Sequence, residues 1–199
     1  MSEFWNEKFS GEQFLYGEEP NKFVKNESYR ITPNSKILCL AEGEGRNGVF
    51  LASHGHDVTC VDLSNVGLEK ASSLALQKNV TVKTVHSDIF HFESPEKYDA
   101  IICTFLHLEY ERLKLFCVKI FNILNTNGLF IGQFFTKEQL NKNSGGPKDI
   151  NLLYDPKILE RVFVHSKFKV LKLDTKDEDL DEGEGHKGIA SLVSIIAEK

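Results

Sequence analysis

From Ser35 onward the chain alternates short apolar runs with amphipathic stretches, and this order constrains the fold more than any other feature of the sequence. The apolar runs are strand-sized, and the stretches between them repeat apolar residues at helical spacing. Apolar strands joined by amphipathic helices are typical of a parallel sheet that is covered by helices on both faces. The predicted strands are residues 36–40, 57–61, 80–85, 98–104 and 129–135, and the predicted helices are residues 46–53, a segment between Ser64 and Asn79, and residues 113–124.

After the fifth predicted strand the pattern changes. Residues 141–147 form a loop without periodicity, and residues 156–164 are expected to form a helix. Residues 168–173 and 189–196 are strand-like with no helix between them, so we expect an antiparallel hairpin closed by a long acidic loop at 174–188. The predicted fold class is α/β: a single-domain, Rossmann-like, doubly wound sheet of seven strands, mostly parallel, with a C-terminal antiparallel hairpin.

The chain has 199 residues and a mass of 22.6 kDa, which suits one domain and argues against separate cofactor and substrate domains. Acidic residues outnumber basic ones by 29 to 24, so a surface dedicated to nucleic acid is not expected. No apolar run approaches the ~20 residues of a membrane helix, and the first residues lack the pattern of a signal peptide. We expect a cytoplasmic protein, a monomer or weak dimer, without membrane or nucleic-acid partners.

The residue types that bind metals are present, but their spacing does not indicate a metal site. None of the four cysteines belongs to a CxxC pair, so neither a zinc site nor a redox dithiol is indicated, and reduced core thiols are expected. His186 and the acids between Asp174 and Glu184 match no standard metal-binding loop. We predict that these acids form a solvated loop and that the protein holds no metal.

The first predicted strand ends at a glycine turn, A-E-G-E-G, that leads into a helix. Glycine lets a ligand approach the backbone closely, and the start of the helix offers free N–H groups. Gly43, Gly45 and Gly48 satisfy GxGxxG, which by itself fits a dinucleotide site or merely a tight turn. Asp62 ends the next strand, 19 residues after Gly43, where a carboxylate accepts both ribose hydroxyls. Together the turn and the acid indicate a site for an adenosine-bearing ligand.

The third predicted strand is followed by Ser87-Asp88-Ile89 at the same rim of the sheet. Ligands of open parallel sheets bind beyond the carboxyl ends of the strands, near the switch point of the strand order. There the Asp88 carboxylate can accept a hydrogen bond from an adenine amino group, and the N–H of Ile89 can donate to a ring nitrogen. A helix cap or a solvated turn acid is the alternative role for Asp88.

Taken in order, these motifs resemble the class I S-adenosylmethionine-dependent methyltransferases over nearly the whole chain. The similar segments are KILCLAEGEGRNGVFLA, DVTCVDLS, HSDIF, KYDAIICTFLHL, LNTNGLFIGQFF and the terminal hairpin. Within this superfamily, WNEKFSGEQFLYGEEPNKFV and the closing LDEGEGHKG are similar to segments of the small tellurite-resistance and thiopurine methyltransferases. The resemblance implies S-adenosylmethionine as cofactor and S-adenosylhomocysteine as product. It also implies one methyltransferase domain over residues 1–199, in which a leader (1–30) folds over a cofactor-binding core (35–135) and residues 136–199 supply the last helix and hairpin.

The sequence departs from the family pattern at the glycine turn. The family usually has an acid in the first strand and a glycine where the turn begins, and Cys39 and Ala41 stand in those places. Glu42 and the backbone carbonyls around Ala41 are the two alternatives for holding the amino group of the ligand. The predicted cofactor-binding residues are Ala41, Glu42, Gly43, Gly45, Asp62, Leu63, Asp88, Ile89, Thr104 and Phe105.

Methyl transfer from a sulfonium releases a neutral thioether, so alignment of nucleophile, methyl group and sulfur supplies most of the catalysis. His107 follows the fourth predicted strand and is the candidate base, with a merely lining role as its alternative. Arg46 is expected to pair with an anionic substrate or with Glu44, or to lie on the surface. Trp5 and Tyr16 are predicted to belong to the lid and acceptor pocket, with core packing as the alternative.

These expectations combine into S-adenosylmethionine-dependent methyl transfer to a small-molecule acceptor by in-line displacement. One alternative is an NAD-binding Rossmann oxidoreductase, in which Asp88 would have no required role. A second is a non-catalytic module that binds S-adenosylmethionine, which the departures at Cys39 and Ala41 keep open. A third is methylation of a protein acceptor.

Overall fold

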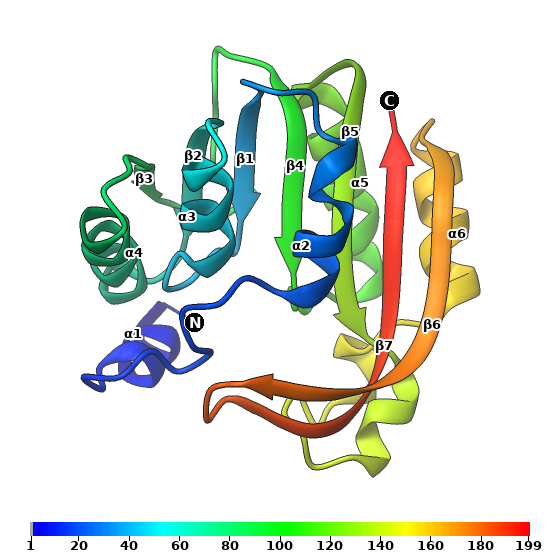
Figure 1. The fold of residues 1–199 in the computed structure, drawn as a ribbon. Helices are drawn as coiled ribbons and strands as arrows, with labels where there is room; N and C mark the ends of the chain where they lie inside the picture. Colours follow the sequence, from blue (N-terminus) through cyan, green and yellow to red (C-terminus); the bar gives the residue numbers. More distant parts are fainter. Residues whose placement is uncertain (1) are drawn as a thin grey trace.

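The computed structural model describes residues 2–199. Their strands form one seven-stranded sheet in the order β3-β2-β1-β4-β5-β7-β6 (Figure 1). Neighbouring strands among β1 to β5 are parallel, and β7 runs antiparallel to both β5 and β6. The predicted α/β class, the mostly parallel sheet and the antiparallel hairpin are confirmed. The strands are β1 (Lys36–Leu40), β2 (Asp57–Asp62), β3 (Lys83–His86), β4 (Tyr98–Thr104), β5 (Leu124–Phe135), β6 (Lys169–Glu182) and β7 (His186–Glu198).

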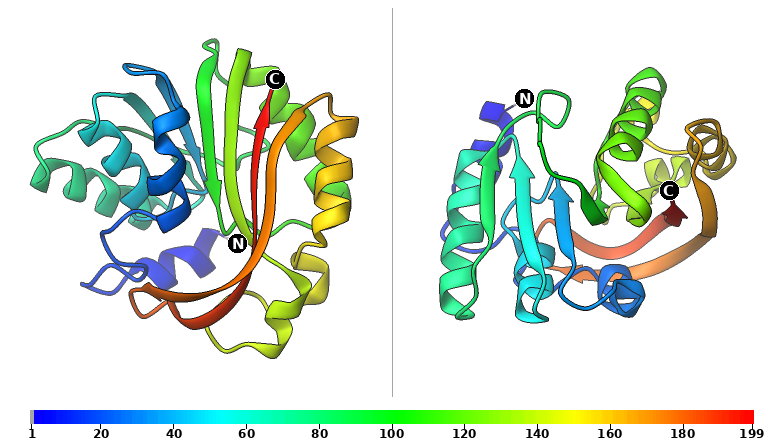
Figure 2. Two further views of the ribbon diagram at one scale, coloured as in Figure 1. Left: turned by 45° about the vertical axis from the view of Figure 1, so that its right-hand side comes forward. Right: turned by 90° about the horizontal axis from the view of Figure 1, so that it is seen from above.

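Helices cover both faces of the sheet, as crossover connections between parallel strands require. Helices α2, α3 and α4 lie on one face, and α5 and α6 lie on the other (Figure 2). The Oγ atom of Ser64 accepts a hydrogen bond from the N–H of Gly67 and caps the start of α4, as predicted. No helix within residues 2–199 has the length and apolar character needed to cross a membrane. The α-helices are α1 (Ser2–Phe9), α2 (Lys22–Glu27), α3 (Arg46–Ser53), α4 (Asn65–Gln77), α5 (Tyr110–Ile123) and α6 (Pro156–His165).

The core consists of two apolar layers, one on each face of the sheet. Alternate residues of a strand point to opposite faces. In β1, Leu38 and Leu40 pack in the layer that includes α5 and α6, whereas Ile37 and Cys39 pack in the layer that includes α2 and α3. Because both faces are covered, every one of these four side chains is buried, which explains why the strand reads as a continuous apolar run. The four cysteines are buried and unpaired, as expected of core thiols.

The predicted acidic loop at 174–188 is wrong. β6 continues to Glu182, β7 begins at His186, and the two strands pair without interruption from Asp174 opposite Ser194 down to the turn. Backbone pairing supplies the hydrogen bonds of this ribbon, and most of the acidic side chains of β6 face solvent. A strand such as β6, whose side chains are mostly polar or charged, cannot be recognised from apolar residues in the sequence. Pairing with β7 holds it in the sheet. Figure 1 shows the distal half of this hairpin at the end of the sheet toward which the parallel strands point.

Two further strand boundaries differ from the prediction. β3 begins later than predicted, at Lys83, because Val80 and Val82 pack in an apolar cluster with the helices instead of pairing with β2. β5 begins earlier than predicted, at Leu124, which already pairs with Tyr98 of β4. The expected Asn-Gly turn is accommodated there as an irregularity in the β4–β5 pairing.

Candidate active site

The glycine turn joins the end of β1 to the start of α3, as predicted, and its glycines are required by close packing. Gly43 and Gly45 have φ values of +61° and +91°, in the left-handed region that favours glycine. A Cβ atom on Gly45 would lie 2.5 Å from the Cβ of Ala71 in α4. A Cβ atom on Gly48 would lie 2.4 Å from the Sγ of Cys60 in β2. The motif therefore brings the start of α3 against its neighbours and leaves the turn at the rim of the sheet.

Two residues that are not glycine also adopt left-handed backbone at this rim. Ala41 has φ +51° directly after β1, and Phe105 has φ +55° directly after β4, the strand beside β1. This conformation costs a non-glycine residue about 1–3 kcal/mol and is found preferentially at functional sites. Ala41 thus adopts the backbone that a glycine favours at the first position of the family motif. The strain marks the ends of β1 and β4 as the centre of the candidate site.

Asp62 ends β2 beside the glycine turn, as predicted, and its carboxylate is already engaged by the backbone. Its Oδ2 accepts a hydrogen bond from the N–H of Gly43 at 2.8 Å, and its Oδ1 accepts one from the N–H of Ser64 at 2.7 Å. Burial raises the pKa of Asp62, and these two hydrogen bonds oppose that effect. A carboxylate has about four acceptor positions, so the hydrogen bonds from Gly43 and Ser64 leave capacity for a ribose hydroxyl. The turn and Asp62 together fit an adenosine-bearing cofactor.

The other acids of the predicted cofactor site have roles within the protein. Asp88 follows β3 and accepts a hydrogen bond from the N–H of Phe90 at 2.7 Å, while its other carboxylate oxygen lies 3.9 Å from Arg112. Glu42 is buried, and its Oε1 accepts a hydrogen bond from the N–H of Gly48 at 2.6 Å. Burial raises the pKa of Glu42 to about 7. Because Glu42 anchors the start of α3, the backbone around Ala41 is the favoured alternative for the amino group of the ligand.

The leader covers the glycine turn from the side of α4. The Oγ of Ser2 donates to the carbonyl of Leu63 at 2.8 Å, and Asn6 accepts a hydrogen bond from Ser64. The ring of Phe9 lies 3.0 Å from where a Cβ atom on Gly43 would be, and Trp5 stacks on Phe9 with 5.5 Å between ring centroids. Helix α1 therefore lies over the rim at which the cofactor is expected.

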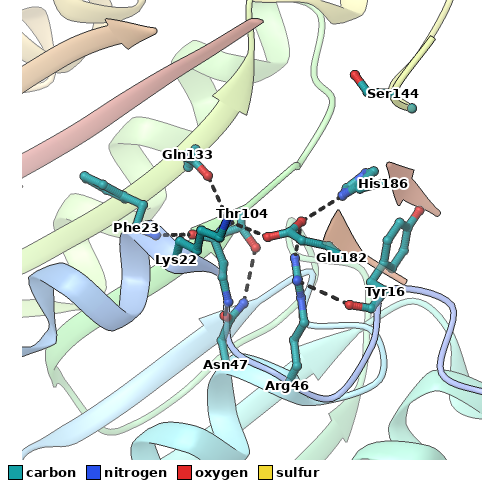
Figure 3. A network of polar contacts seen from close by, with 12 residues as sticks. Tyr16, Lys22, Phe23, Arg46, Asn47, Thr104, Gln133, Ser144, Glu182 and His186 are labelled. Atoms are coloured by element: carbon teal, nitrogen blue, oxygen red, sulfur yellow. Dashed lines mark hydrogen bonds and ion pairs between the residues drawn. The ribbon is translucent and has the colours of Figure 1, made fainter. Parts of the chain in front are cut away.

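Arg46 is buried in the first turn of α3 and pairs with a residue from the far end of the chain (Figure 3). Its Nη2 lies 2.9 Å from the Oε2 of Glu182, at the end of β6. The predicted pairing with Glu44 and the predicted surface position are both wrong. Glu44 instead pairs with Lys70 and accepts a hydrogen bond from the N–H of Leu15. A sequence pattern cannot place Glu182 beside Arg46, because the hairpin crosses the molecule to reach it.

Glu182 also accepts a hydrogen bond from His186, across the hairpin turn. The Nδ1 of His186 lies 3.1 Å from the Oε2 of Glu182 (Figure 3). The Nδ2 of Asn21 lies 3.1 Å from the Oε1 of Glu182. Burial alone would raise the pKa of Glu182, but the hydrogen bond from His186 and the charge of Arg46 outweigh it and lower the pKa to about 2. The prediction that His186 lies in a solvated loop is wrong, since both residues of the pair are buried.

His107, the predicted candidate base, and His186, which was not predicted as a site residue, lie among the same aromatic rings. His186 lies 4.4 Å from Tyr16, 4.3 Å from Phe105 and 5.2 Å from Phe135, measured between ring centroids. His107 stacks on Phe135 at 6.0 Å, and its buried Nδ1 has no hydrogen-bond partner within residues 2–199. Burial and the proximity of His186 lower the pKa of His107 to about 4, so its ring is neutral at pH 7. Tyr16 thus lies at this enclosure, whereas Trp5 lies with Phe9 over the glycine turn.

Sequence reasoning missed a set of buried amides that links the leader, α3 and the sheet. The N–H of Asn21 donates to the Oδ1 of Asn47 at 2.9 Å, and the Nδ2 of Asn21 donates to Gln133 at 2.8 Å. Asn47 in turn donates to the Oγ1 of Thr104 at 3.3 Å, which places predicted Thr104 in the same network. One signal was available, since Gln133 interrupts the apolar run of β5 with a polar side chain.

The sequence of this chain is similar to those of known methyltransferases. A family described as "Methyltransferase domain" matches residues 37–128. The chain is 29% identical over 117 residues to the uncharacterized methyltransferase YbaJ of Bacillus subtilis, which covers 58% of this chain and 46% of that protein. It is 31% identical over 86 residues to the probable S-adenosyl-L-methionine-dependent methyltransferase TehB of Haemophilus influenzae, covering 42% of this chain and 30% of that protein. The chain spans less than half the length of these curated relatives.

Solved structures agree over the whole chain. TehB of Haemophilus influenzae gives a TM-score of 0.72 at 20% identity and covers 100% of this chain and 66% of that one. The chain has the class I S-adenosylmethionine-dependent methyltransferase fold. A structure described for the conversion of a disulfide bond into a thioacetal group during echinomycin biosynthesis gives a TM-score of 0.80 at 13% identity, covering 100% of this chain and 92% of that one. The predicted resemblance to class I methyltransferases, with S-adenosylmethionine as their methyl donor, is confirmed.

The methyltransferase match divides the site into two parts. Residues 37–128 include the glycine turn, Asp62, Asp88 and Thr104, which are predicted to bind the cofactor. The leader and the β6–β7 hairpin, which bring Tyr16 and His186 together, lie outside the matched segment. The predicted cofactor residues thus lie within the matched segment, whereas the aromatic enclosure combines Phe105 and His107 from that segment with Tyr16, Phe135 and His186 from the flanking segments.

Proposed function

We propose that the protein transfers a methyl group from S-adenosylmethionine to a small-molecule acceptor. The observation that carries the proposal is the series formed by the glycine turn, Asp62 and Asp88. These follow β1, β2 and β3, three adjacent parallel strands, so all lie at one rim of the sheet. S-adenosylmethionine supplies a methyl group on a positively charged sulfur, which leaves as a neutral thioether. The task of the protein is then to hold donor and acceptor in line.

In this proposal the predicted cofactor residues have separate tasks. Asp62 accepts the ribose hydroxyls through the carboxylate positions that Gly43 and Ser64 do not use. Asp88 and the N–H of Ile89 hold the adenine, with Leu63 at the same rim. The backbone around Ala41, together with Gly45, holds the methionine part, and Thr104 and Phe105 lie beside the reacting methyl group.

We further propose that the leader is a lid. Phe9 lies against Gly43, and α1 is held to the rim by hydrogen bonds that Ser2 donates to Leu63 and that Asn6 accepts from Ser64, so α1 has to move for the cofactor to enter. A closed lid excludes water from the sulfonium and completes the acceptor site, because the chain after α1 contributes Tyr16 to the aromatic enclosure.

Titration calorimetry with S-adenosylmethionine, S-adenosylhomocysteine and NADH tests the proposal. We expect both adenosyl ligands to bind and to raise the melting temperature, because a ligand selective for the folded state stabilises it. NADH is expected to have no effect. Binding of NADH without a response to either adenosyl ligand would identify a dinucleotide site and reject the proposed function.

A further inference from the structure

The buried cluster of Arg46, Glu182 and His186 lies beside the site of methyl transfer but outside the cofactor rim. Phe105 directly follows β4, at the end of the sheet where the proposed function places the reacting methyl group. The imidazole of His186 lies 4.3 Å from the Phe105 ring and 4.4 Å from the Tyr16 ring. The backbone at Gly145 lies along the Cδ2–Nε2 edge of the imidazole, since a Cβ atom there would lie 2.7 Å from its Cδ2 and 3.5 Å from its Nε2. The buried imidazole is therefore enclosed by aromatic rings and by the backbone at Gly145.

The hydrogen bond to Glu182 determines which nitrogen of His186 carries the hydrogen. An ionised carboxylate only accepts hydrogen bonds, so Nδ1, at 3.1 Å from Oε2, has to be the donor. A neutral imidazole with hydrogen on Nδ1 presents a lone pair at Nε2. No side chain or backbone group of residues 2–199 forms a hydrogen bond with that Nε2 atom. A carboxylate that fixes the ring and tautomer of a histidine is the arrangement that prepares a base.

We infer that the Nε2 atom of His186, in a ring oriented by Glu182, is the base that takes the proton from a neutral S–H or O–H group of an apolar acceptor. This inference rests on the proposed function and extends it to the class of acceptor. His186 is then a catalytic residue, whereas Glu182 and Arg46 are positioning residues that act through it.

The step balances in atoms and charge. The proton of the acceptor S–H or O–H group moves to Nε2 of His186, which becomes an imidazolium. The electron pair of that bond stays on the acceptor and forms its bond to the methyl carbon, while the bond between the methyl carbon and the sulfonium sulfur breaks. The pair from the broken bond stays on sulfur, so one positive charge leaves the donor and one appears on His186. The imidazolium then returns its proton to water.

The surroundings favour a neutral acceptor over an anion. The charge of Arg46 is already compensated by Glu182, at 2.9 Å, and the enclosure is otherwise formed by the rings of Tyr16, Phe105 and Phe135. The Nδ1 of His107, which has no partner in the described chain, is a second buried ring nitrogen beside Phe135. The lone pair at Nε2 of His186, among aromatic rings, suits a group that donates a hydrogen bond and does not suit an oxyanion.

The pH dependence follows from the groups that face His186. Burial lowers the pKa of His186, the contact with Glu182 opposes this, and the charge of Arg46 adds to it. Tyr16, whose pKa is raised to about 12 by burial, and His107, which is neutral at pH 7, add no charge near neutrality. The rate of methyl transfer should therefore rise through a pKa below 6.5 and stay constant above it.

The first test needs no acceptor. Nitrogen NMR of the histidine rings, in protein saturated with S-adenosylhomocysteine, reports which nitrogen of His186 carries hydrogen, with the signals assigned from His186→Gln. We expect the Nδ1–H tautomer at pH 7. An Nε2–H tautomer or a charged ring at that pH would overturn the inference, whereas failure of S-adenosylhomocysteine to bind the wild-type protein would instead reject the proposed function.

The second test measures transfer to substituted benzenethiols and phenols of graded acidity. His186→Gln should lower kcat for the weakly acidic members about 10²- to 10⁴-fold, the range for general acid–base catalysis. The loss should shrink for the most acidic benzenethiols, which ionise unaided, and the rise of rate with pH should disappear. Glu182→Gln should lower kcat less and restore part of it relative to Glu182→Ala. His165→Gln, at the exposed end of α6, is the matched control and should leave kcat unchanged.

Two kinetic outcomes would contradict the inference. An equal loss for every acceptor in His186→Gln, regardless of acidity, would mean that the residue only supports the structure. A wild-type protein that binds S-adenosylhomocysteine but methylates none of these thiols and phenols would reject the acceptor class while leaving the cofactor assignment intact.

Discussion

Arg46 and Glu182 are 136 residues apart in the chain, and their side chains form a buried ion pair with 2.9 Å between Nη2 and Oε2. The pair joins the first turn after the glycine motif to the tip of the C-terminal hairpin. Through it, the segment proposed to hold the cofactor and the segment proposed to enclose the acceptor are joined directly. Loss of the pair is therefore expected to lower the stability of the fold and to change the arrangement of the site.

The first prediction concerns that pair. Arg46→Met should lower the free energy of unfolding by about 3–5 kcal/mol, because it leaves the Glu182 carboxylate buried without its counter-charge. The double variant Arg46→Met/Glu182→Leu should recover much of the loss, and urea unfolding measures both. Lys36→Met, which breaks an ion pair with exposed Glu96, is the control and should have little effect. A double variant no more stable than Arg46→Met would show that the loss comes from packing.

The second prediction concerns Asp62. Asp62→Ala should weaken binding of S-adenosylhomocysteine by about 1.5–3 kcal/mol, the range for hydrogen bonds to charged groups, as measured by calorimetry. It should also lower the melting temperature, because the N–H groups of Gly43 and Ser64 lose their acceptor. Asp62→Asn keeps one carbonyl oxygen and should fall between the wild type and Asp62→Ala. Wild-type affinity in Asp62→Ala would make this residue a structural cap of the turn only.

The third prediction concerns the leader. Trp5 is the only tryptophan of the chain and stacks on Phe9, which lies against Gly43. Titration with S-adenosylhomocysteine should therefore change its emission, and limited proteolysis near Tyr16 should become slower. The control is Trp5→Phe/Tyr29→Trp, which moves the reporter to a site that is 73% exposed. An equal change in both proteins, or none in either, would argue against a lid coupled to the ligand.

The fourth prediction concerns Glu42 and pH. Its folded-state pKa of about 7 lies above the ordinary value of 4.5, so between these values the folded protein binds more protons than the unfolded chain. Stability from this group is therefore fully present below pH 4.5 and is lost as the pH rises to 7, by on the order of 3 kcal/mol. The difference in unfolding free energy between the wild type and Glu42→Gln should change accordingly between pH 5 and pH 8. Exposed Glu12→Gln is the control and should show no such change.

The proposed cofactor side of the molecule was predictable because its signals are local. Apolar runs mark β1, β2 and β4 because these strands are covered on both faces, and the glycine turn lies at the end of one of them. Asp62 follows from spacing alone, since parallel strands end at one rim. The dual use of its carboxylate, by Gly43 and Ser64, did not follow from spacing, because the turn geometry decides it.

The proposed acceptor side was not predictable because its contacts are between distant segments. β6 carries charged residues and is a strand only because β7 pairs with it. Once this ribbon is formed, its turn reaches the leader, where the N–H of Gly185 donates to the carbonyl of Leu15 at 2.9 Å. His186 and Glu182 then become buried residues, although their sequence surroundings read as a solvated acidic stretch.

The position of β7 in the sheet determines the order in which the protein can be assembled. β7 follows β6 in the chain but lies between β5 and β6, so β6 has no place in the sheet until β7 has emerged. During synthesis the apolar strand β5 therefore presents an open edge, which is available for intermolecular pairing. Closing it requires contacts between segments that are far apart in sequence, and such contacts form slowly. Nascent chains are thus expected to acquire a cofactor-binding half first and to depend on chaperones until the hairpin inserts as one unit.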